Sequence, residues 1–265
     1  MGGRLHLGEG RARTIIAPLV LFAAILLIWE ASLRIFSVSR GIIAPPSAIY
    51  ATLVGSFPLF MMHAWATFVE IVMGFAISAV VGVALGALIA ISKWSRQAFY
   101  PNMVFFQLIP KAAVAPLFVL WLGLGSPSRV AFAVFMSFFP IALATATGLE
   151  NTRAETIRLC RSLTATRWQT FTRVRFPFAL PYIFAGLKIG MAMSMIGIIV
   201  GEFISAQEGL GYVIMFASSA GDSTPLYAAL FLLAALGIGL YACVLLAEAA
   251  AQRWYGAPFV SEGFA

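Results

Sequence analysis

The chain has 265 residues, of which 62% are hydrophobic and only 10% are charged. A water-soluble domain of this length needs more charged surface, so the composition excludes an ordinary soluble globular protein and indicates a chain that lies mostly in lipid. The net charge of +7 does not indicate nucleic-acid binding, because the basic residues lie between long apolar runs. Cys160 and Cys243 have neither disulfide nor metal-ligand spacing, so two free thiols are expected.

Six segments contain the roughly 20 predominantly apolar residues that a membrane-spanning helix needs. They are 14–36, 62–92, 98–122, 128–149, 181–205 and 226–250. No clear cleavage site follows the first apolar run, so it is expected to be a retained span rather than a signal peptide. The sequence therefore predicts an all-α polytopic membrane protein with about six transmembrane helices.

The lysine and arginine residues indicate how these segments cross the membrane. With the N-terminus inside, the segments on that side hold twelve basic residues, and those on the opposite side hold three, Arg34, Arg40 and Arg129. Cytoplasmic loops carry an excess of basic residues, so both termini and the polar stretch 151–180 are expected in the cytoplasm. Arg34 follows Glu30 by four residues, which favours a local ion pair.

Small residues recur at every fourth position in two of the predicted spans. They are Gly74, Ser78, Gly82, Gly86 and Ala90 in segment 62–92, and Gly186, Gly190 and Ser194 in segment 181–205. Such a stripe lets another helix backbone approach closely, so we expect both to pack inside a helix bundle or across a dimer. The alternative explanation is that glycine is simply common in membrane helices.

The polar stretch 151–180 begins with the pattern of a short amphipathic helix. Residues 152–163 place Leu159, Cys160 and Leu163 on one side of that helix, and charged residues, mostly arginines, take the rest. Basic residues on a protruding element suit a partner with an acidic surface. The alternative is an ordinary basic loop on the inner side of a membrane protein.

A second short helix is predicted directly after a turn at residues 164–165. Thr166 and Gln169 fit a capping box, in which the threonine oxygen accepts a backbone N–H and the glutamine side chain reaches back. The helix is expected over 167–175, with Pro177 and Pro181 ending it and starting the next span.

Two aromatic side chains suggest how these short helices pack. Trp168 and Phe171 lie one helical turn apart in the second helix. We expect both rings to lie between the two short helices and to make the stretch a compact knob.

The order of motifs along residues 44–250 resembles one protein family. The stretch ETIRLCRSLTATRWQTFTRVRFPFALPYIFAGLKIG resembles the EAA loop of permease subunits of binding-protein-dependent ABC importers. Further matching segments are APPSAI, GFAISAVVGVALGALIAIS, IPKAAVAPLFVLWLGLG, FFPIALATATGL and GEFISAQEGLGYVI. The branch with the greatest similarity carries nitrate, taurine, alkanesulfonates and related organic solutes.

This resemblance implies a type I ABC importer permease fold, in an assembly whose other subunits bind ATP and deliver the solute. The chain would form the translocation path for a small organic solute or anion in the bacterial inner membrane. Two copies of a cytoplasmic ATPase would bind ATP and Mg²⁺, an extracytoplasmic protein would deliver the solute, and a second permease copy would complete a homodimer. No cofactor and no nucleic acid are expected on this chain. Residues 1–61 would hold the tail, first span and outer loop, 62–250 the permease core, and 251–265 a cytoplasmic tail.

The resemblance also assigns contact with the ATPase to one set of residues. They are Glu155, Arg158, Leu159, Cys160, Arg161, Ser162, Leu163, Thr164 and Trp168. The chain departs from the family pattern at Arg158-Leu159-Cys160, which stands in place of Glu-Ala-Ala, and at Thr164, which replaces the usual glycine. Threonine resists the left-handed backbone that glycine adopts, so the turn is expected to be rebuilt or strained. Arg158-Leu159 resembles a sub-branch for riboflavin or pyrimidine-type vitamin precursors.

Four residues are candidates for the solute path, because buried ionisable groups and adaptable methionines in a membrane invite a role. They are Lys111, Met191, Met195 and Glu202. Lys111 would attract an anionic group; alternatively it snorkels or pairs with a carboxylate such as Glu70. The methionines would line an apolar passage or fill the core. Glu202 would lie at the outer mouth or reach interfacial water.

The sequence contains no phosphate-binding loop of the form G-x-x-x-x-G-K-[ST], so ATP hydrolysis is expected in a partner and not in this chain. Two other function classes stay open. An ion-gradient-driven secondary transporter would need paired carboxylates near the midplane, where Glu70 stands alone. A non-transporting scaffold or sensor subunit would keep the helix bundle and the basic loop.

Overall fold

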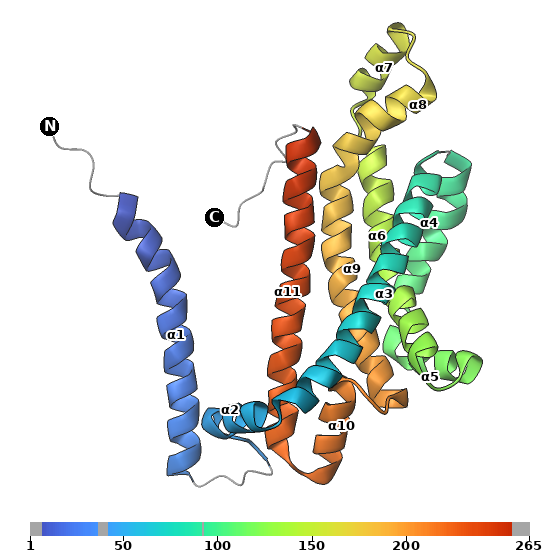
Figure 1. Ribbon diagram of the computed structural model, residues 1–265. Helices are drawn as coiled ribbons and strands as arrows, with labels where there is room; N and C mark the ends of the chain where they lie inside the picture. The colour runs from blue at the N-terminus through green and yellow to red at the C-terminus, as the bar shows by residue number, and fades with distance from the viewer. Residues whose placement is uncertain (1–6, 37–41, 92, 256–265) are drawn as a thin grey trace, which may run out of the picture. The chain divides into compact units, whose positions relative to one another are not determined.

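The computed structural model describes residues 7–36, 42–91 and 93–255, and these residues are almost entirely helical (Figure 1). The helices are α1 (Leu7–Ile35), α2 (Pro46–Gly55), α3 (Phe57–Ile91), α4 (Lys93–Leu108), α5 (Lys111–Leu122), α6 (Ser126–Glu150), α7 (Ala154–Ser162), α8 (Arg167–Thr170), the π-helical turn η1 (Phe171–Arg175), α9 (Phe176–Ser205), α10 (Leu210–Ala220) and α11 (Ser223–Tyr255). The all-α prediction is confirmed. The helices form two compact units, which are Met1–Met61 with Val213–Phe231 and Met62–Tyr212 with Leu232–Ala265.

Four helical stretches within the described ranges are long and apolar enough to cross a membrane, or five if one bent pair counts as a span. The four are Phe57–Ala90, Ser126–Glu150, Arg167–Ser205 and Ser223–Tyr255, and they contain the predicted spans 62–92, 128–149, 181–205 and 226–250 almost entirely. The first predicted span, 14–36, falls on α1, several of whose side chains lie outside the described residues.

The predicted span 98–122 is not a continuous helix. It is divided into α4 and α5, which meet at an angle of 99°. The break falls at Ile109 and Pro110, and Pro110 is the N-cap of α5. Proline has no N–H and disfavours helical backbone at the residue before it, so the helix stops there and restarts in a new direction.

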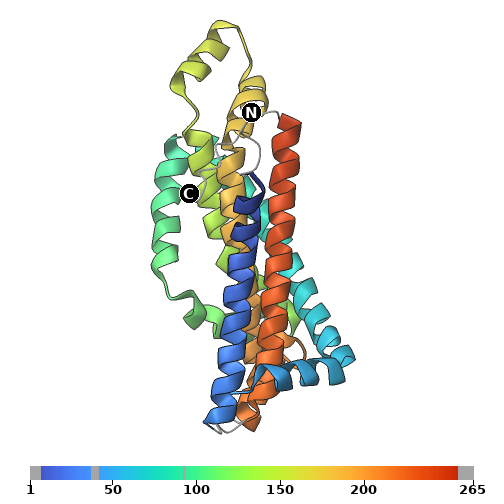
Figure 2. The same ribbon diagram turned by 90° about the vertical axis from the view of Figure 1, so that its left-hand side faces the viewer.

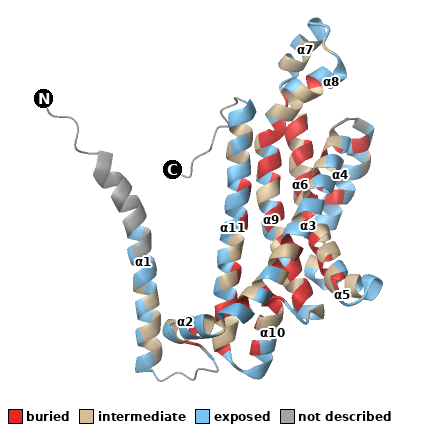
Figure 3. Cartoon of the chain, viewed as in Figure 1, coloured by how far each residue is buried: buried red, intermediate tan, exposed pale blue. Residues whose placement is uncertain are grey.

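The larger unit is built around α6, which lies between the glycine-lined faces of α3 and α9. A Cβ atom on Gly82 would lie 2.8 Å from Ile141, and one on Gly190 would lie 2.6 Å from the same side chain. A Cβ atom on Gly86 would lie 2.5 Å from the carbonyl oxygen of Ala142. The prediction that both stripes serve close packing is confirmed, and the packing is within this chain. Figure 3 shows buried positions concentrated along α6 and α9.

In the smaller unit, Glu30 of α1 fixes the start of α2. Its carboxylate forms the predicted ion pair with Arg34, at 2.6 Å. It also accepts hydrogen bonds from the Ser47 backbone N–H at 3.0 Å and from the Ser47 hydroxyl at 2.8 Å. The first turn of a helix has unpaired N–H groups, so a carboxylate there both satisfies a donor and suits the helix dipole.

The prediction that Pro177 and Pro181 end the second short helix is wrong. Helical backbone runs from Arg167 to Ser205, through α8, η1 and α9. Pro177 lies in the first turn of α9, directly after the π-helical turn, and Pro181 lies inside α9. A π turn is wider than an α turn, which gives room for a proline that cannot donate to the preceding turn.

Candidate functional site

The α7–α8 segment (154–170) extends beyond the ends of α6 and α9, as Figures 1 and 2 show. No residue of α7 is buried. The segment holds all the residues assigned to ATPase contact, which are Glu155, Arg158, Leu159, Cys160, Arg161, Ser162, Leu163, Thr164 and Trp168. The structure thus gathers them on one protruding element.

Large apolar side chains are exposed on this segment. The exposed fractions are 59% for Leu159, 70% for Leu163 and 70% for Trp168. Arg158 and Arg161 are exposed as well. Apolar anchors surrounded by arginines are typical of a protein–protein interface, in which tryptophan and arginine contribute much of the binding free energy.

The turn after α7 keeps the left-handed backbone although it carries threonine. Thr164 has a φ of 59°, and among the described residues no other non-glycine residue has a positive φ. The Thr164 N–H donates to Arg161 O at 3.1 Å, and the Ala165 N–H donates to Cys160 O at 3.0 Å. These two bonds form a Schellman motif with Thr164 at the position that glycine normally takes. The turn is not rebuilt, and the threonine bears the strain of this backbone.

The predicted capping box at the start of α8 is confirmed. The Gln169 N–H donates to Thr166 Oγ1 at 3.2 Å, and the Thr166 N–H donates to Gln169 Oε1 at 2.8 Å. Two N–H groups that a free helix end would leave unpaired are satisfied. The Schellman motif and the capping box therefore fix both sides of the short connection between α7 and α8.

The prediction that Trp168 and Phe171 lie between the two short helices is wrong. Trp168 is exposed and stacks on Phe171 of the same helical run, with ring centroids 5.9 Å apart. Phe171 packs toward the helix bundle, near Leu149 and Ile183. Residues three apart lie on one face of a helix, so the two rings meet each other rather than α7. As a result, Trp168 is available to a partner.

Lys111 lies in the first turn of α5, at the bend from α4. Its ammonium group donates to Met136 O at 3.5 Å and lies 5.5 Å from the centre of the Phe139 ring. The alternative in which Lys111 pairs with Glu70 is wrong, because Glu70 bonds to Arg129. Lys111 is thus held by a carbonyl oxygen and an aromatic face.

The other path candidates lie apart from Lys111. Met191 is buried in a core cluster, and Met195 packs against the same cluster. Glu202 is only 2% exposed, so the alternative in which it reaches interfacial water is wrong. The structure does not bring the four candidates together, and their role in a solute path stays a prediction.

A buried ion pair joins α3 to α6, and sequence reasoning missed it. Arg129 was counted with the outer loops, but it lies in α6 and is 4% exposed. Its Nε donates to Glu70 Oε2 at 2.8 Å, and its Nη2 donates to Glu70 Oε1. The bidentate geometry offsets the cost of burying both charges. The rule that ionisable groups in membrane helices have a role flags Glu70, but it does not identify the partner.

Glu202 belongs to a second buried polar group, which holds the turn before α10. Its carboxylate accepts hydrogen bonds from Thr67 Oγ1 at 2.7 Å and from the Gly211 N–H at 2.6 Å. Thr67 Oγ1 accepts the Leu210 N–H at 2.8 Å, and His63 Nδ1 accepts the Gly209 N–H at 3.1 Å. Side chains of α3 and α9 thereby bond three successive backbone amides, one in this turn and two in the first turn of α10.

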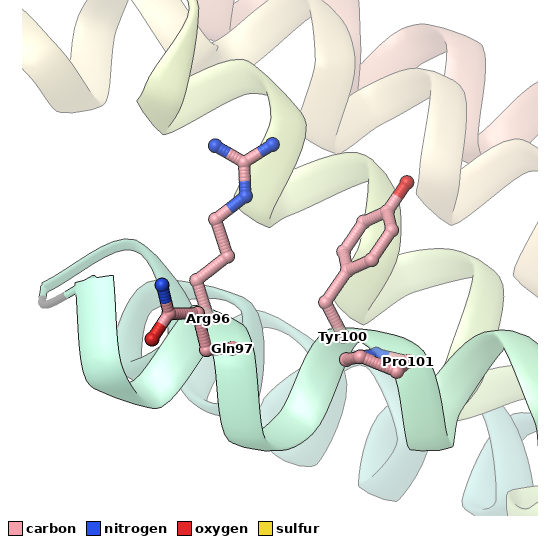
Figure 4. A pocket seen from close by; sticks show the side chains of 4 residues that line it. All are labelled: Arg96, Gln97, Tyr100 and Pro101. Carbon is pink, nitrogen blue, oxygen red and sulfur yellow. The ribbon is translucent and has the colours of Figure 1, made fainter.

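A shallow hollow on α4 is lined by Arg96, Gln97, Tyr100 and Pro101 (Figure 4). Arg96 reaches α6, where it pairs with Glu150 at 3.2 Å, and its guanidinium lies 5.8 Å from the Tyr100 ring centre. The hollow is open and its arginine is already neutralised, so it has no unpaired charge to offer a ligand.

Comparison with known proteins agrees with this architecture. Residues 82–253 match the family described as the binding-protein-dependent transport system inner membrane component. The chain is 34% identical to the formylaminopyrimidine transport permease protein ThiX of Halalkalibacterium halodurans, over 92% of this chain and 98% of that protein. It is 36% identical to the riboflavin transport system permease protein RibX of Chloroflexus aurantiacus, over 61% and 60% of the two chains.

A solved structure shows the same fold. A chain of the MetNI methionine ABC transporter, in an inward-facing conformation, superimposes with a TM-score of 0.63 and 19% identity, over 76% of this chain and 98% of that chain. The helical architecture, the protruding α7–α8 segment and the family match lead to one conclusion. The chain belongs to the inner-membrane permease subunits of binding-protein-dependent ABC importers.

Proposed function

We propose that the α7–α8 segment is the surface that a cytoplasmic ATPase grips to drive this permease. The observation that carries the proposal is the exposure of Leu159, Leu163 and Trp168 beside exposed arginines on the α7–α8 segment, in which α7 has no buried residue. Such apolar surface is costly in water unless another protein covers it. The surrounding positive charge suits an acidic groove on that protein.

The proposal includes the arrangement of the assembly. Two copies of this chain form the path between them, two ATPase subunits bind ATP and Mg²⁺, and an extracytoplasmic protein delivers the solute. Both termini and the α7–α8 segment lie in the cytoplasm, which the excess of basic residues on that side supports. This chain supplies the alternating-access switch, and the ATPase supplies the chemical step.

We further propose that the solute is a planar nitrogen heterocycle of the pyrimidine or flavin type. Support comes from similarity to the formylaminopyrimidine permease ThiX over nearly all of both chains. Calorimetric titration of the partner solute-binding protein with a formylaminopyrimidine, riboflavin, taurine and nitrate tests the class. Tight binding of a heterocycle alone supports the proposal, and tight binding of taurine or nitrate contradicts it.

The ATPase contact is tested by co-purification of this chain with its partner ATPase. Trp168→Ala and Arg161→Glu are expected to reduce ATPase recovery about 10-fold or more, since exposed tryptophan and arginine anchors contribute about 2 kcal/mol each. Trp254→Ala is the matched control, because Trp254 is 87% exposed at the end of α11. Unchanged recovery with both α7–α8 variants would refute the contact.

A further inference from the structure

Arg175 connects the α7–α8 segment to two helices of the bundle. It lies in the π-helical turn η1, and its side chain is partly buried. Its Nη2 donates to Leu149 O at 3.0 Å and to Ala90 O at 3.5 Å, and its Nε lies 3.3 Å from Leu149 O. The guanidinium therefore bridges the C-terminal ends of α6 and α3.

The chemistry at this point favours a cation with several donors. The last carbonyl groups of a helix have no partner within the helix and form the negative end of its dipole. Leu149 lies in the last turn of α6, and Ala90 lies in the last turn of α3. An arginine fork can donate to two carbonyl groups at once, whereas a lysine ammonium acts as a point charge. The arrangement is suited to arginine in particular.

This bridge supplies a connection that the covalent chain lacks. The segment Asn151–Arg153 joins α6 to α7, and helical backbone joins α8 to α9. Movement of α7–α8 therefore reaches both α6 and α9 through the backbone. Helix α3 has no such covalent connection to this segment, and it receives the movement only through side-chain contacts. The Arg175 guanidinium is a charged contact of this kind.

The π-helical turn η1 is a second feature that points to a functional role at this position. Single π turns in long helices are uncommon and occur frequently at functional sites. Here the turn lies between the α7–α8 segment and α9, and Arg175 is the last residue of the turn. A widened turn at that position sets the direction in which Arg175 leaves the helix, toward the ends of α3 and α6.

We propose that Arg175 is a positioning residue that transmits movement of the α7–α8 segment to the cytoplasmic end of α3, which it ties to the end of α6. This inference rests on the proposed grip of the ATPase on α7–α8, and it adds the route by which that grip reaches the bundle. Arg175 makes no direct contact with the ATPase in this proposal. Its loss is expected to separate ATP hydrolysis from helix movement.

The test measures movement of α3 directly and needs no solute. A spin label is placed on α3 by Val80→Cys, at a side chain that is 72% exposed, with Cys160 and Cys243 replaced by serine. The complete complex with its ATPase is reconstituted in nanodiscs. Double electron–electron resonance then measures the distance between the spin labels of the two permease copies, with and without MgATP and vanadate.

Arg175→Met is expected to reduce the population that shifts with MgATP and vanadate about 10-fold, which corresponds to about 1.4 kcal/mol, because the variant loses the charged hydrogen bonds to α3 and α6. ATPase co-purification and basal ATP turnover are expected to stay unchanged. Arg173→Met is the matched control, because Arg173 lies in the same π turn but is exposed. The label distance in Arg173→Met should change with MgATP and vanadate as it does in the parent complex. Arg175→Lys should give an intermediate shift.

Each other outcome has a definite meaning. If the distance between the α3 labels changes in Arg175→Met as much as in the parent complex, or does not change in the parent complex, the transmission route is overturned. The proposed contact between the ATPase and α7–α8 is unaffected by either result. Loss of ATPase binding in Arg175→Met also overturns the route, because Arg175 would then serve docking. If Arg175→Met does not accumulate in the membrane, Arg175→Lys decides, and a full shift in that variant refutes the route. Failure of the proposed function appears separately, as unchanged ATPase recovery in both Trp168→Ala and Arg161→Glu.

Discussion

The turn between α7 and α8 gives a sharp prediction, because replacement of Thr164 by glycine should stabilise it. The φ of 59° at Thr164 lies in the left-handed region. That region costs a residue with a Cβ atom about 1–2 kcal/mol. Glycine avoids this cost but loses about 0.5–1 kcal/mol through its greater freedom in the unfolded chain. Thr164→Gly is therefore expected to stabilise the turn by about 0.5–1 kcal/mol.

Hydrogen exchange measures this free energy at the bonds concerned. The amides of Thr164 and Ala165 donate to Arg161 O and Cys160 O, at 3.1 and 3.0 Å. Exchange of a peptide that spans them, with the protein in nanodiscs, should slow about 2–5-fold in Thr164→Gly. The acceptors and the rest of the segment are unchanged by this substitution.

Ser162→Gly is the control with the opposite sign. Ser162 is the last residue of α7, where the backbone is right-handed. Glycine there is expected to destabilise the helix end by about 0.5 kcal/mol and to speed exchange. Equal or faster exchange in Thr164→Gly than in the parent protein would refute the reasoning, since it would show that Thr164 bears no strain.

Three further predictions concern the bundle and the helix cap. Glu70→Gln leaves Arg129 buried without a full charge partner and should lower the free energy of unfolding by about 3–5 kcal/mol. Glu70→Leu combined with Arg129→Met removes both charges and should restore most of the lost stability. Thermal unfolding in detergent compares the two variants with the parent protein. Gly86→Val should prevent close packing of α3 on α6 and abolish the monodisperse peak in size-exclusion chromatography, whereas Gly55→Val, with no atom within 4 Å of its Cβ position, should not. Thr166→Ala should destabilise α8 by about 1 kcal/mol, seen as faster amide exchange in that helix; an unchanged rate would contradict the capping role.

The features that sequence reasoning predicted correctly are local ones. The capping box depends on Thr166 and Gln169, three residues apart, and the ion pair of Glu30 and Arg34 depends on a spacing of four. The small-residue stripe through Gly82 is a periodic pattern within one helix. Each of these follows from helical geometry alone, so the printed sequence contains the information.

The features that it missed depend on contacts between distant residues. Glu70 and Arg129 are 59 residues apart, and Thr67 and Glu202 are 135 residues apart. Nothing in either local pattern indicates the partner, because helix packing decides which faces meet. Trp168 was misplaced for a related reason: its spacing to Phe171 permits packing on a second helix or stacking within one helix, and only the structure distinguishes them.

Cysteine labelling tests most directly whether the α7–α8 segment is a cytoplasmic surface that the ATPase covers. Leu163→Cys is introduced with Cys160 and Cys243 replaced by serine, and a membrane-impermeant maleimide is applied to intact spheroplasts and to inside-out vesicles. Labelling is expected only in the inside-out vesicles, and bound ATPase should suppress it there. Labelling of Leu163→Cys from the outside of intact spheroplasts would contradict the account.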